Sequence, residues 1–253
     1  RIKKGVIDDI SVDGSLIEVS QNNTGKYQIA VNLMANGPIQ SIRKLLENES
    51  LGINENISSI PDGITGDTDL WANFSVPLGE FSPNKEIPFS ASAKIQHARI
   101  PKAILGKDFE KGELRIDVDG DRLRVLGISD FNGSPFTFEQ ETLFNNNSEV
   151  NGTKKFSLNI TSTDLKKLNL PIPLELDGMI SLKAKIIDLA EGNSKVNATI
   201  DLMNSELLIS QLNWKKPLGS VGRLTVDVDI QNNKVIRLHN INLITSDLNI
   251  NAQ

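Results

Sequence analysis

The side chains able to do acid–base or metal chemistry are few and scattered in this sequence. Histidine occurs only at His97 and His239, and cysteine is absent. A multi-histidine metal site and a thiolate site are therefore excluded, and a histidine-based triad would need one of these two residues. Each histidine stands between residues typical of a strand, so we expect both to be solvent-facing strand residues. The sequence thus predicts no catalytic residue, no metal site and no cofactor.

Three aspartates around a glycine form the pattern that comes nearest to a cation site. Asp117, Asp119 and Asp121 flank Gly120 and loosely resemble a calcium loop. An EF-hand also needs flanking helices and a glutamate at the twelfth position, which here is Ile128. No glycine-rich phosphate loop, nucleophile elbow or HExxH motif accompanies them. We therefore interpret the aspartates as residues of the solvent-exposed face and the turn of a β-hairpin.

These aspartates belong to the stretch that organises the chain, residues 112–139. Apolar and charged residues alternate strictly from Leu114 to Val118, which is typical of a strand with one buried face. Gly120-Asp121 predicts a tight turn, after which the alternation restarts, and a third strand is expected at 136–140. The unit is an antiparallel meander with one apolar and one charged face. Its apolar positions are Leu114, Ile116, Val118, Leu123 and Val125.

The same pattern recurs downstream. Residues 222–229 match 112–119 with an offset of 222 − 112 = 110, and an upstream glycine of each copy, Gly66 and Gly178, also matches. Between them, strand 89–95 is matched to strand 196–202. Three matches in one order at nearly one offset predict a diverged internal repeat, with copies at about 66–139 and 178–248. The apolar positions of the second copy are Leu224, Val226, Val228 and Ile230.

Composition narrows the class of protein. A net charge of −5 disfavours nucleic acid as a partner, and 38% hydrophobic with 5% aromatic residues suits sheets that keep one face wet. No run is long enough for a transmembrane helix. The chain begins without methionine and ends inside a strand-like pattern, so we expect a fragment of a longer protein. Oligomeric state is left open.

The expected fold is all-β: an extended, twisted antiparallel sheet of repeated meanders with one or two short helices. Helical spacing after Pro38 predicts an amphipathic helix over 38–47, and a helical turn is expected near 162–168. An asparagine-rich stretch divides the chain into a first β-repeat region, 1–145, and a second, 146–253, that continues the same sheet.

Several short motifs resemble the central region of YhdP-like proteins, members of the AsmA-like group of Gram-negative bacteria. They include the segments at 64–70 and 112–119, the Asn132-Gly133 turn, and Trp214-x-Lys216-x-x-Gly219. The resemblance covers about residues 6–252. It implies a sheet curled into an open hydrophobic groove in the periplasm, anchored at the inner membrane by a helix outside this chain. It also implies phospholipids as partners, carried between inner and outer membranes, and no catalytic residues.

The physics of the alternating strands fits this implied function. A lipid chain in water costs about 0.8 kcal/mol per CH₂, and a concave sheet with an apolar residue at every second position can shelter that surface. The nine apolar positions of the two copies are the predicted lipid-lining residues. Two alternatives stay open: a β-sandwich adhesion or carbohydrate-binding module, and a scaffold assisting outer-membrane protein assembly.

Overall fold

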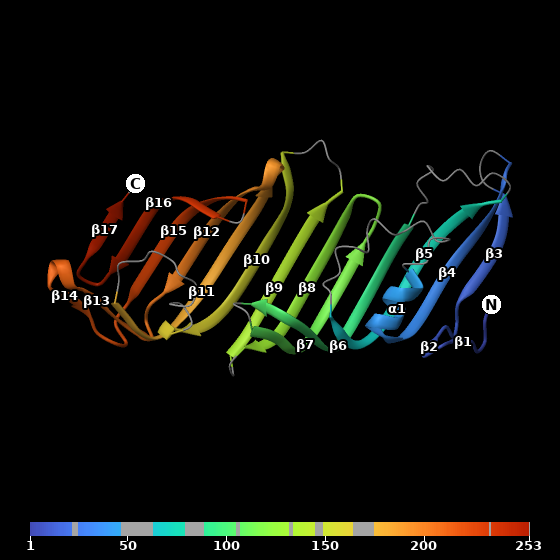
Figure 1. Ribbon diagram of the computed structural model, residues 1–253, viewed down its shortest axis with the longest axis horizontal. Coiled ribbons are helices and arrows are strands. Elements are labelled where there is room, and N and C mark those ends of the chain that lie inside the picture. The colour runs from blue at the N-terminus through green and yellow to red at the C-terminus, as the bar shows by residue number, and fades with distance from the viewer. Residues whose placement is uncertain are drawn as a thin grey trace. The chain divides into compact units, whose positions relative to one another are not determined.

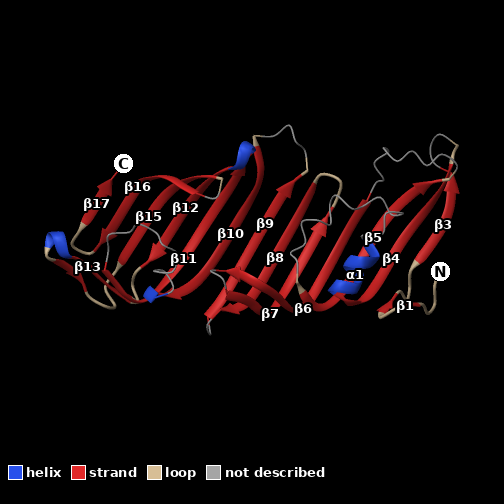
Figure 2. Cartoon of the chain, in the orientation of Figure 1, coloured by secondary structure: helices blue, strands red, loops and turns tan. Residues whose placement is uncertain are grey.

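The computed structural model describes residues 1–21, 25–46, 63–78, 89–104, 107–131, 134–144, 149–163, 175–232 and 234–252. The chain divides into two compact units, Arg1–Gly127 and Ile128–Gln253. Most of the described residues lie in antiparallel strands (Figures 1 and 2), which confirms the predicted all-β class and its meanders. One α-helix, α1 (Ile39–Leu46), has both of its ends within the described residues.

The strands of unit 1 and its helix follow one another along the chain. Strand β8 begins in unit 1 and ends in unit 2. The elements are β1 (Val6–Ile7), β2 (Ile10–Ser11), β3 (Leu16–Gln21), β4 (Tyr27–Pro38), α1 (Ile39–Leu46), β5 (Thr65–Pro77), β6 (Phe89–Ile104), β7 (Lys107–Val118) and β8 (Arg122–Phe131).

Unit 2 contains the remaining strands and two short 3₁₀ turns. The elements are β9 (Ser134–Leu143), β10 (Val150–Thr161), β11 (Glu175–Leu189), η2 (Ala190–Gly192), β12 (Asn193–Asp201), β13 (Ser205–Ile209), η3 (Ser210–Leu212), β14 (Trp214–Lys216), β15 (Gly222–Gln231), β16 (Lys234–Thr245) and β17 (Asn249–Ala252).

The sheet of unit 1 is a meander in which neighbours along the chain pair side by side. Strands β3, β4, β5, β6 and β7 pair in that order, and β2 adds a short pairing to β4. The Asp119 N–H donates to the Arg122 carbonyl oxygen at 3.0 Å, which closes the predicted two-residue turn at Gly120-Asp121. By the register of such a hairpin, Val118 lies opposite Leu123 and Ile116 lies opposite Val125.

In unit 2 the main sheet pairs β9, β10, β11, β12, β15, β16 and β17 in order. Strand β11 leaves β12 at its beginning and pairs there with β13, which in turn pairs with β14. The change of partner falls at Gly178, whose φ is +106°. A Cβ at this glycine would lie 2.7 Å from the Asn204 carbonyl oxygen, so the corner requires glycine.

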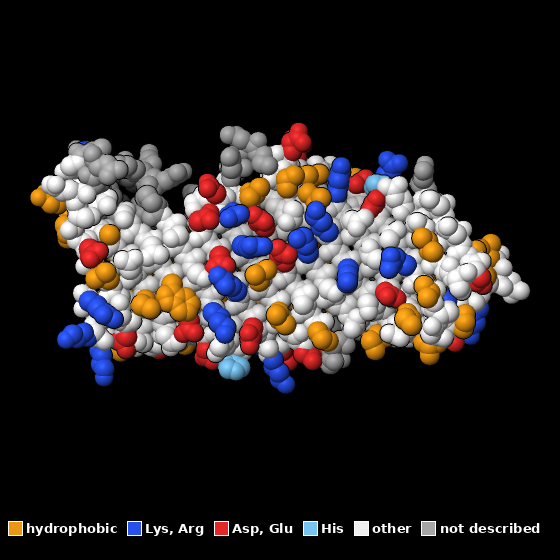
Figure 3. All heavy atoms as spheres, turned by 180° about the vertical axis from the view of Figure 1, so that it is seen from behind, with side chains coloured by type: hydrophobic (Ala, Val, Ile, Leu, Met, Phe, Trp, Pro, Cys, Tyr) orange, Lys and Arg blue, Asp and Glu red, His pale blue; other side chains and the backbone are white. Residues whose placement is uncertain are grey.

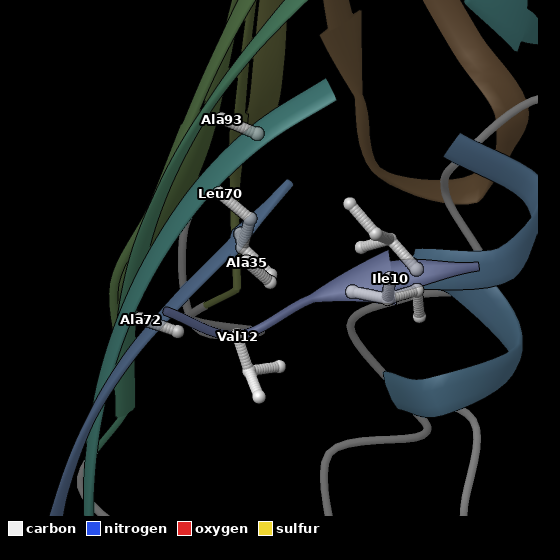
Figure 4. Close-up of a cluster of buried hydrophobic side chains, with 7 residues drawn as sticks. Ile10, Val12, Ala35, Leu70, Ala72 and Ala93 are labelled. Carbon is white, nitrogen blue, oxygen red and sulfur yellow. The ribbon is translucent and has the colours of Figure 1, made fainter. Parts of the chain in front are cut away.

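The core of unit 1 lies between the sheet and the first segment of the chain. Helix α1 places Ile42, which is 1% exposed, against Leu70 and Ala72 of β5. Figure 4 shows Ala35, Leu70 and Ala93 pointing from the sheet toward the side where Ile10 lies. The predicted helix at 38–47 is therefore confirmed, with Pro38 as the last residue of β4 rather than the first helical residue. Of the turn expected at 162–168, only Ser162 and Thr163 are described, and both are helical.

The register also tests the internal repeat. Leu114 in β7 lies opposite the buried Ile95, and Leu224 in β15 lies opposite the buried Ile200. Both leucines are themselves about equally buried, at 4% and 5% exposure. Their environments correspond, as the matched glycines at 112 and 222 imply.

One detail of the repeat was wrong. Because Ala93 pairs with Ile116 and Ala198 pairs with Val226, residues 91–95 correspond to 196–200, not to 198–202. A shift of two residues keeps every side chain on the same face, so alternation alone could not reveal the error. The domain boundary expected at 145/146 falls between β9 and β10, which pair with each other, whereas the compact units divide within β8.

Gly66 gives a first testable prediction for the fold. Its φ is +147°, and a Cβ there would lie 2.7 Å from Ile95 Cγ2 and 2.8 Å from the Gln96 carbonyl oxygen. We expect Gly66→Ala to lower the free energy of unfolding by about 1–3 kcal/mol, through strain and overpacking. Gly120→Ala, where a Cβ meets no atom within 4 Å, is the matched control. Urea titrations of both variants that gave equal midpoints would contradict the role assigned to Gly66.

Candidate ligand-binding faces

Each of the two histidines has one carboxylate within ion-pair distance. His97 is at a bulge in β6 with φ of +53°, and its Nδ1 lies 3.2 Å from Asp67 Oδ2 at an exposed position. The His239 Nε2 lies 3.4 Å from Asp229 Oδ2 on the surface of β15 and β16. Among the described residues, no group of three or more histidine or acidic side chains is arranged to hold a metal ion.

The aspartates around Gly120 serve the hairpin, as interpreted from the sequence. Asp119 Oδ1 accepts hydrogen bonds from the backbone N–H groups of Asp121 and Arg122, each at 3.0 Å. Asp117 accepts from the Ser92 hydroxyl at 2.7 Å and from Arg115 Nε at 2.9 Å. Their carboxylates therefore stabilise the turn and the neighbouring strand.

The pairing register gives each sheet one apolar and one polar face. In unit 1 the apolar face carries rows of cross-strand partners, one being Ala35, Leu70, Ala93 and Ile116, and another Leu33, Ala72, Ala91 and Val118. The opposite, polar face carries Asn36, Asp69, Lys94 and Arg115 in the row behind the first. Figure 3 views the polar side, where side chains of both charges are interspersed.

Unit 2 repeats this division. One apolar row is Leu158, Leu182, Ile200, Leu224, Leu243 and Ile250, and the next is Phe138, Phe156, Ala184, Ala198 and Val226. The polar face behind them carries the partners Lys155, Lys185, Asn197 and Asp227. Apolar side chains therefore form continuous bands across the strands, the first from β10 to β17 and the second from β9 to β15.

All nine predicted lining residues lie on these apolar faces, five in the sheet that includes β7 and β8 and four on β15. They differ in exposure. Leu114, Leu123, Leu224 and Val228 are buried. Ile116, Val118, Val125, Val226 and Ile230 are half-buried.

Sequence reasoning missed a partly exposed apolar row of unit 1, which crosses β3, β4, β5 and β6. Ile17 is 54% exposed, while Val31, Phe74 and Phe89 are half-buried. Beside them Val19 is 63% exposed and lies opposite Ile29. We call Ile17, Val31, Phe74 and Phe89 the open row. The alternation in each strand signals its face, but only the packing of α1 shows which rows are covered.

On the polar face of unit 2, one carboxylate links three neighbouring strands. Asp227 accepts hydrogen bonds from Asn240 Nδ2 at 2.8 Å and from Asn197 Nδ2 at 2.6 Å, joining three neighbouring strands. These hydrogen bonds hold the pKa of Asp227 below its ordinary value, and the one from Asn240 has the larger effect. Asp117, the matched residue of the first copy, also has a lowered pKa. Burial is the largest single influence on this group and raises its pKa, but the hydrogen bonds from Ser92 and Arg115 together outweigh it.

This network predicts a pH dependence. A carboxyl group whose pKa is lower in the folded state stabilises the fold above its unfolded pKa of about 4, and this contribution is lost as the pH falls through the folded value. We expect Asp227→Asn to lower stability at neutral pH by on the order of 1 kcal/mol or less, and to reduce the further loss below about pH 4. Thermal unfolding of both proteins across this range measures the difference. Parallel curves would contradict the assignment.

Comparison of the sequence with protein-family models, with curated proteins and with solved structures found no match. Within the described residues, the structure contains no helix with the length and apolar character needed to span a membrane.

Proposed function

We propose that this chain is a segment of a periplasmic lipid-transfer protein, in which the apolar faces of the sheets shelter phospholipid acyl chains. The observation that carries the proposal is the half-buried state of large apolar side chains that share one face. Phe74 and Phe89 in unit 1, and Phe138 and Phe156 in unit 2, are neither fully covered nor mixed with polar residues in their rows. A closed core leaves side chains of this size almost without exposure.

The dimensions of a row suit an acyl chain. The row from Phe138 to Val226 crosses five strands, and four strand spacings give about 19 Å. One acyl chain spans half of a hydrocarbon core, about 15 Å. Ala184 and Ala198 occupy the middle of this row, so its centre is lower than its phenylalanine end. Sheltering a chain there would lower its free energy by roughly 0.8 kcal/mol for each CH₂ removed from water.

The proposal extends to the cellular setting that the family resemblance implies. The full-length protein would be anchored in the inner membrane and would pass phospholipids toward the outer membrane. The fold supports only the lipid-binding part of the proposal: binding acyl chains needs no reactive group, and the sheets offer a continuous apolar surface with a polar face behind it.

Neighbouring residues on opposite faces of β15 provide the test. Val226 is half-buried on the apolar face, and Thr225 is half-buried on the polar face. We expect Val226→Asp to reduce phospholipid that co-purifies with the protein at least tenfold, because a carboxylate among acyl chains is costly. Thr225→Asp should retain the lipid. The two variants are compared by the amount of phospholipid phosphorus per protein, measured after lipid extraction.

Both variants should fold, which circular dichroism checks, since each carboxylate can reach water. Equal lipid loss in the two variants, or no phospholipid with the unmodified protein purified from its own envelope, would contradict the proposal.

A further inference from the structure

The polar face of unit 1 carries an exposed tryptophan in the middle of a regular arrangement of side chains. Trp71 in β5 is 44% exposed and lies opposite Met34 of β4 and Ser92 of β6. The next row on one side is Asn32, Asn73 and Ser90, and on the other side Asn36, Asp69 and Lys94. Trp71 is thus the centre of a three-by-three group of positions, which we call the Trp71 platform.

Seven of the eight positions around Trp71 carry a side chain able to form hydrogen bonds, and Met34, 43% exposed, is the exception. Three of the seven are already engaged: Asn36 donates to Asp69 at 2.5 Å, and Ser92 donates to Asp117, outside the platform, at 2.7 Å. In the described part of the chain, the side chains of Asn32, Asn73 and Ser90 have no hydrogen-bond partner. One whole edge of the platform therefore has unused donors and acceptors.

This arrangement is specific to unit 1. In the register of unit 2, Ala184 corresponds to Leu70, so that Lys185 takes the place of Trp71, with Asn197 opposite it. The chain's other tryptophan, Trp214, donates its Nε1–H to Asp247 Oδ2 at 3.1 Å. Trp71 has no such partner among the described residues, so no hydrogen bond within the fold accounts for a tryptophan at this position.

We propose that the Trp71 platform binds a pyranose ring of a neutral saccharide. The face of an indole ring stacks on the C–H face of a sugar, and the amides and hydroxyl of the free edge are placed to bond the hydroxyl groups at the ring's rim. Asp69 and Lys94 offset one another in charge, which favours an uncharged ligand over an anion. A protein or acyl partner would need a wider apolar surface than one indole and one thioether.

The chain's two tryptophans make the test direct, because each contributes one indole N–H resonance. We expect neutral hexasaccharides of glucose, mannose and N-acetylglucosamine, each at about 10 mM, to shift the Trp71 indole resonance and leave that of Trp214 unchanged. Loss of one signal in Trp71→Phe assigns the two resonances. Because the platform contacts a single ring, weak binding to more than one of these saccharides is the expected result.

Variants then locate the binding. Saturation transfer from protein to saccharide should fall at least tenfold in Trp71→Ala and severalfold in Asn73→Ala, and should be unchanged in Lys185→Ala on the polar face of unit 2. Movement of neither indole resonance with any of the three saccharides would overturn the proposal, and so would undiminished transfer in Trp71→Ala. A Trp71 shift caused by phosphatidylcholine vesicles and not by saccharide would overturn it in favour of a membrane-facing surface. The first of these outcomes, in which neither resonance moves, is observed on the unmodified protein and does not depend on a variant's folding.

Discussion

Replacing Ile95 by aspartate is expected to unfold unit 1. Ile95 is fully buried on β6, where it lies opposite Thr68 on one side and Leu114 on the other. A carboxylate there would lose its hydration without gaining a charged partner, and the apolar contacts of isoleucine would also be lost. We expect the free energy of unfolding to fall by more than about 4 kcal/mol, enough to abolish a cooperative transition in a marginally stable unit.

Val118→Asp is the matched control, because Val118 is on the same face but half-buried. Its carboxylate can reach water, so we expect a loss of about 1 kcal/mol. Urea denaturation followed by circular dichroism compares the two. Similar losses in both variants would show that the covered and open parts of the apolar face are not energetically distinct.

The second large effect is expected at Lys216 in unit 2. Its side chain is 1% exposed, and its ammonium group donates to the carbonyl oxygens of Ser205 at 2.8 Å and Pro217 at 3.1 Å. The hydrocarbon part of the side chain fills the space beside Gly222, where a Cβ would lie 2.6 Å from Lys216 Cε. Burial lowers the pKa of this ammonium group. The residue therefore ties β13 and β14 to the start of β15.

Lys216→Glu would place a carboxylate against two carbonyl oxygens with no donor in reach, and we expect a loss of about 3–5 kcal/mol. Lys215→Glu makes the same change in charge one residue earlier. There the side chain is exposed and forms an ion pair with Glu206 at 2.9 Å, so a loss of about 1 kcal/mol or less is expected. Thermal melts of the two variants give the comparison. A Lys216 variant as stable as the Lys215 variant would remove the structural role assigned to the buried lysine.

Much of the fold could be predicted because the alternation of side chains fixes both the strand and its face. The hairpin at Gly120-Asp121 and helix α1 follow from turn residues and a change of period, and both are found. The pairing register of the strands was harder to predict from the sequence. Shifting strand 89–95 by two residues against its match leaves every apolar residue on the same face, so only the observed pairing places Ala93 opposite Ile116.

The candidate site was predictable as a face and not as a set of exposed residues. Leu114 and Val118 alternate identically in the sequence, yet the first is buried and the second is half-buried. The open row on β3 to β6 went unrecognised for the same reason. Trp71 was visible in the sequence as a strand residue, but its polar neighbours come from β4 and β6, and their alignment depends on register.

The central claim, that the apolar face is the surface that meets acyl chains, is tested most directly by adjacent photoreactive residues on β5. Phe74 is half-buried in the open row, and Asn73 is exposed on the opposite face. A photoreactive amino acid placed at 74 in the intact protein, in cells of its source, should crosslink to phospholipid, and the same residue at 73 should not. Absence of lipid at 74, or equal crosslinking at both positions, would contradict the account.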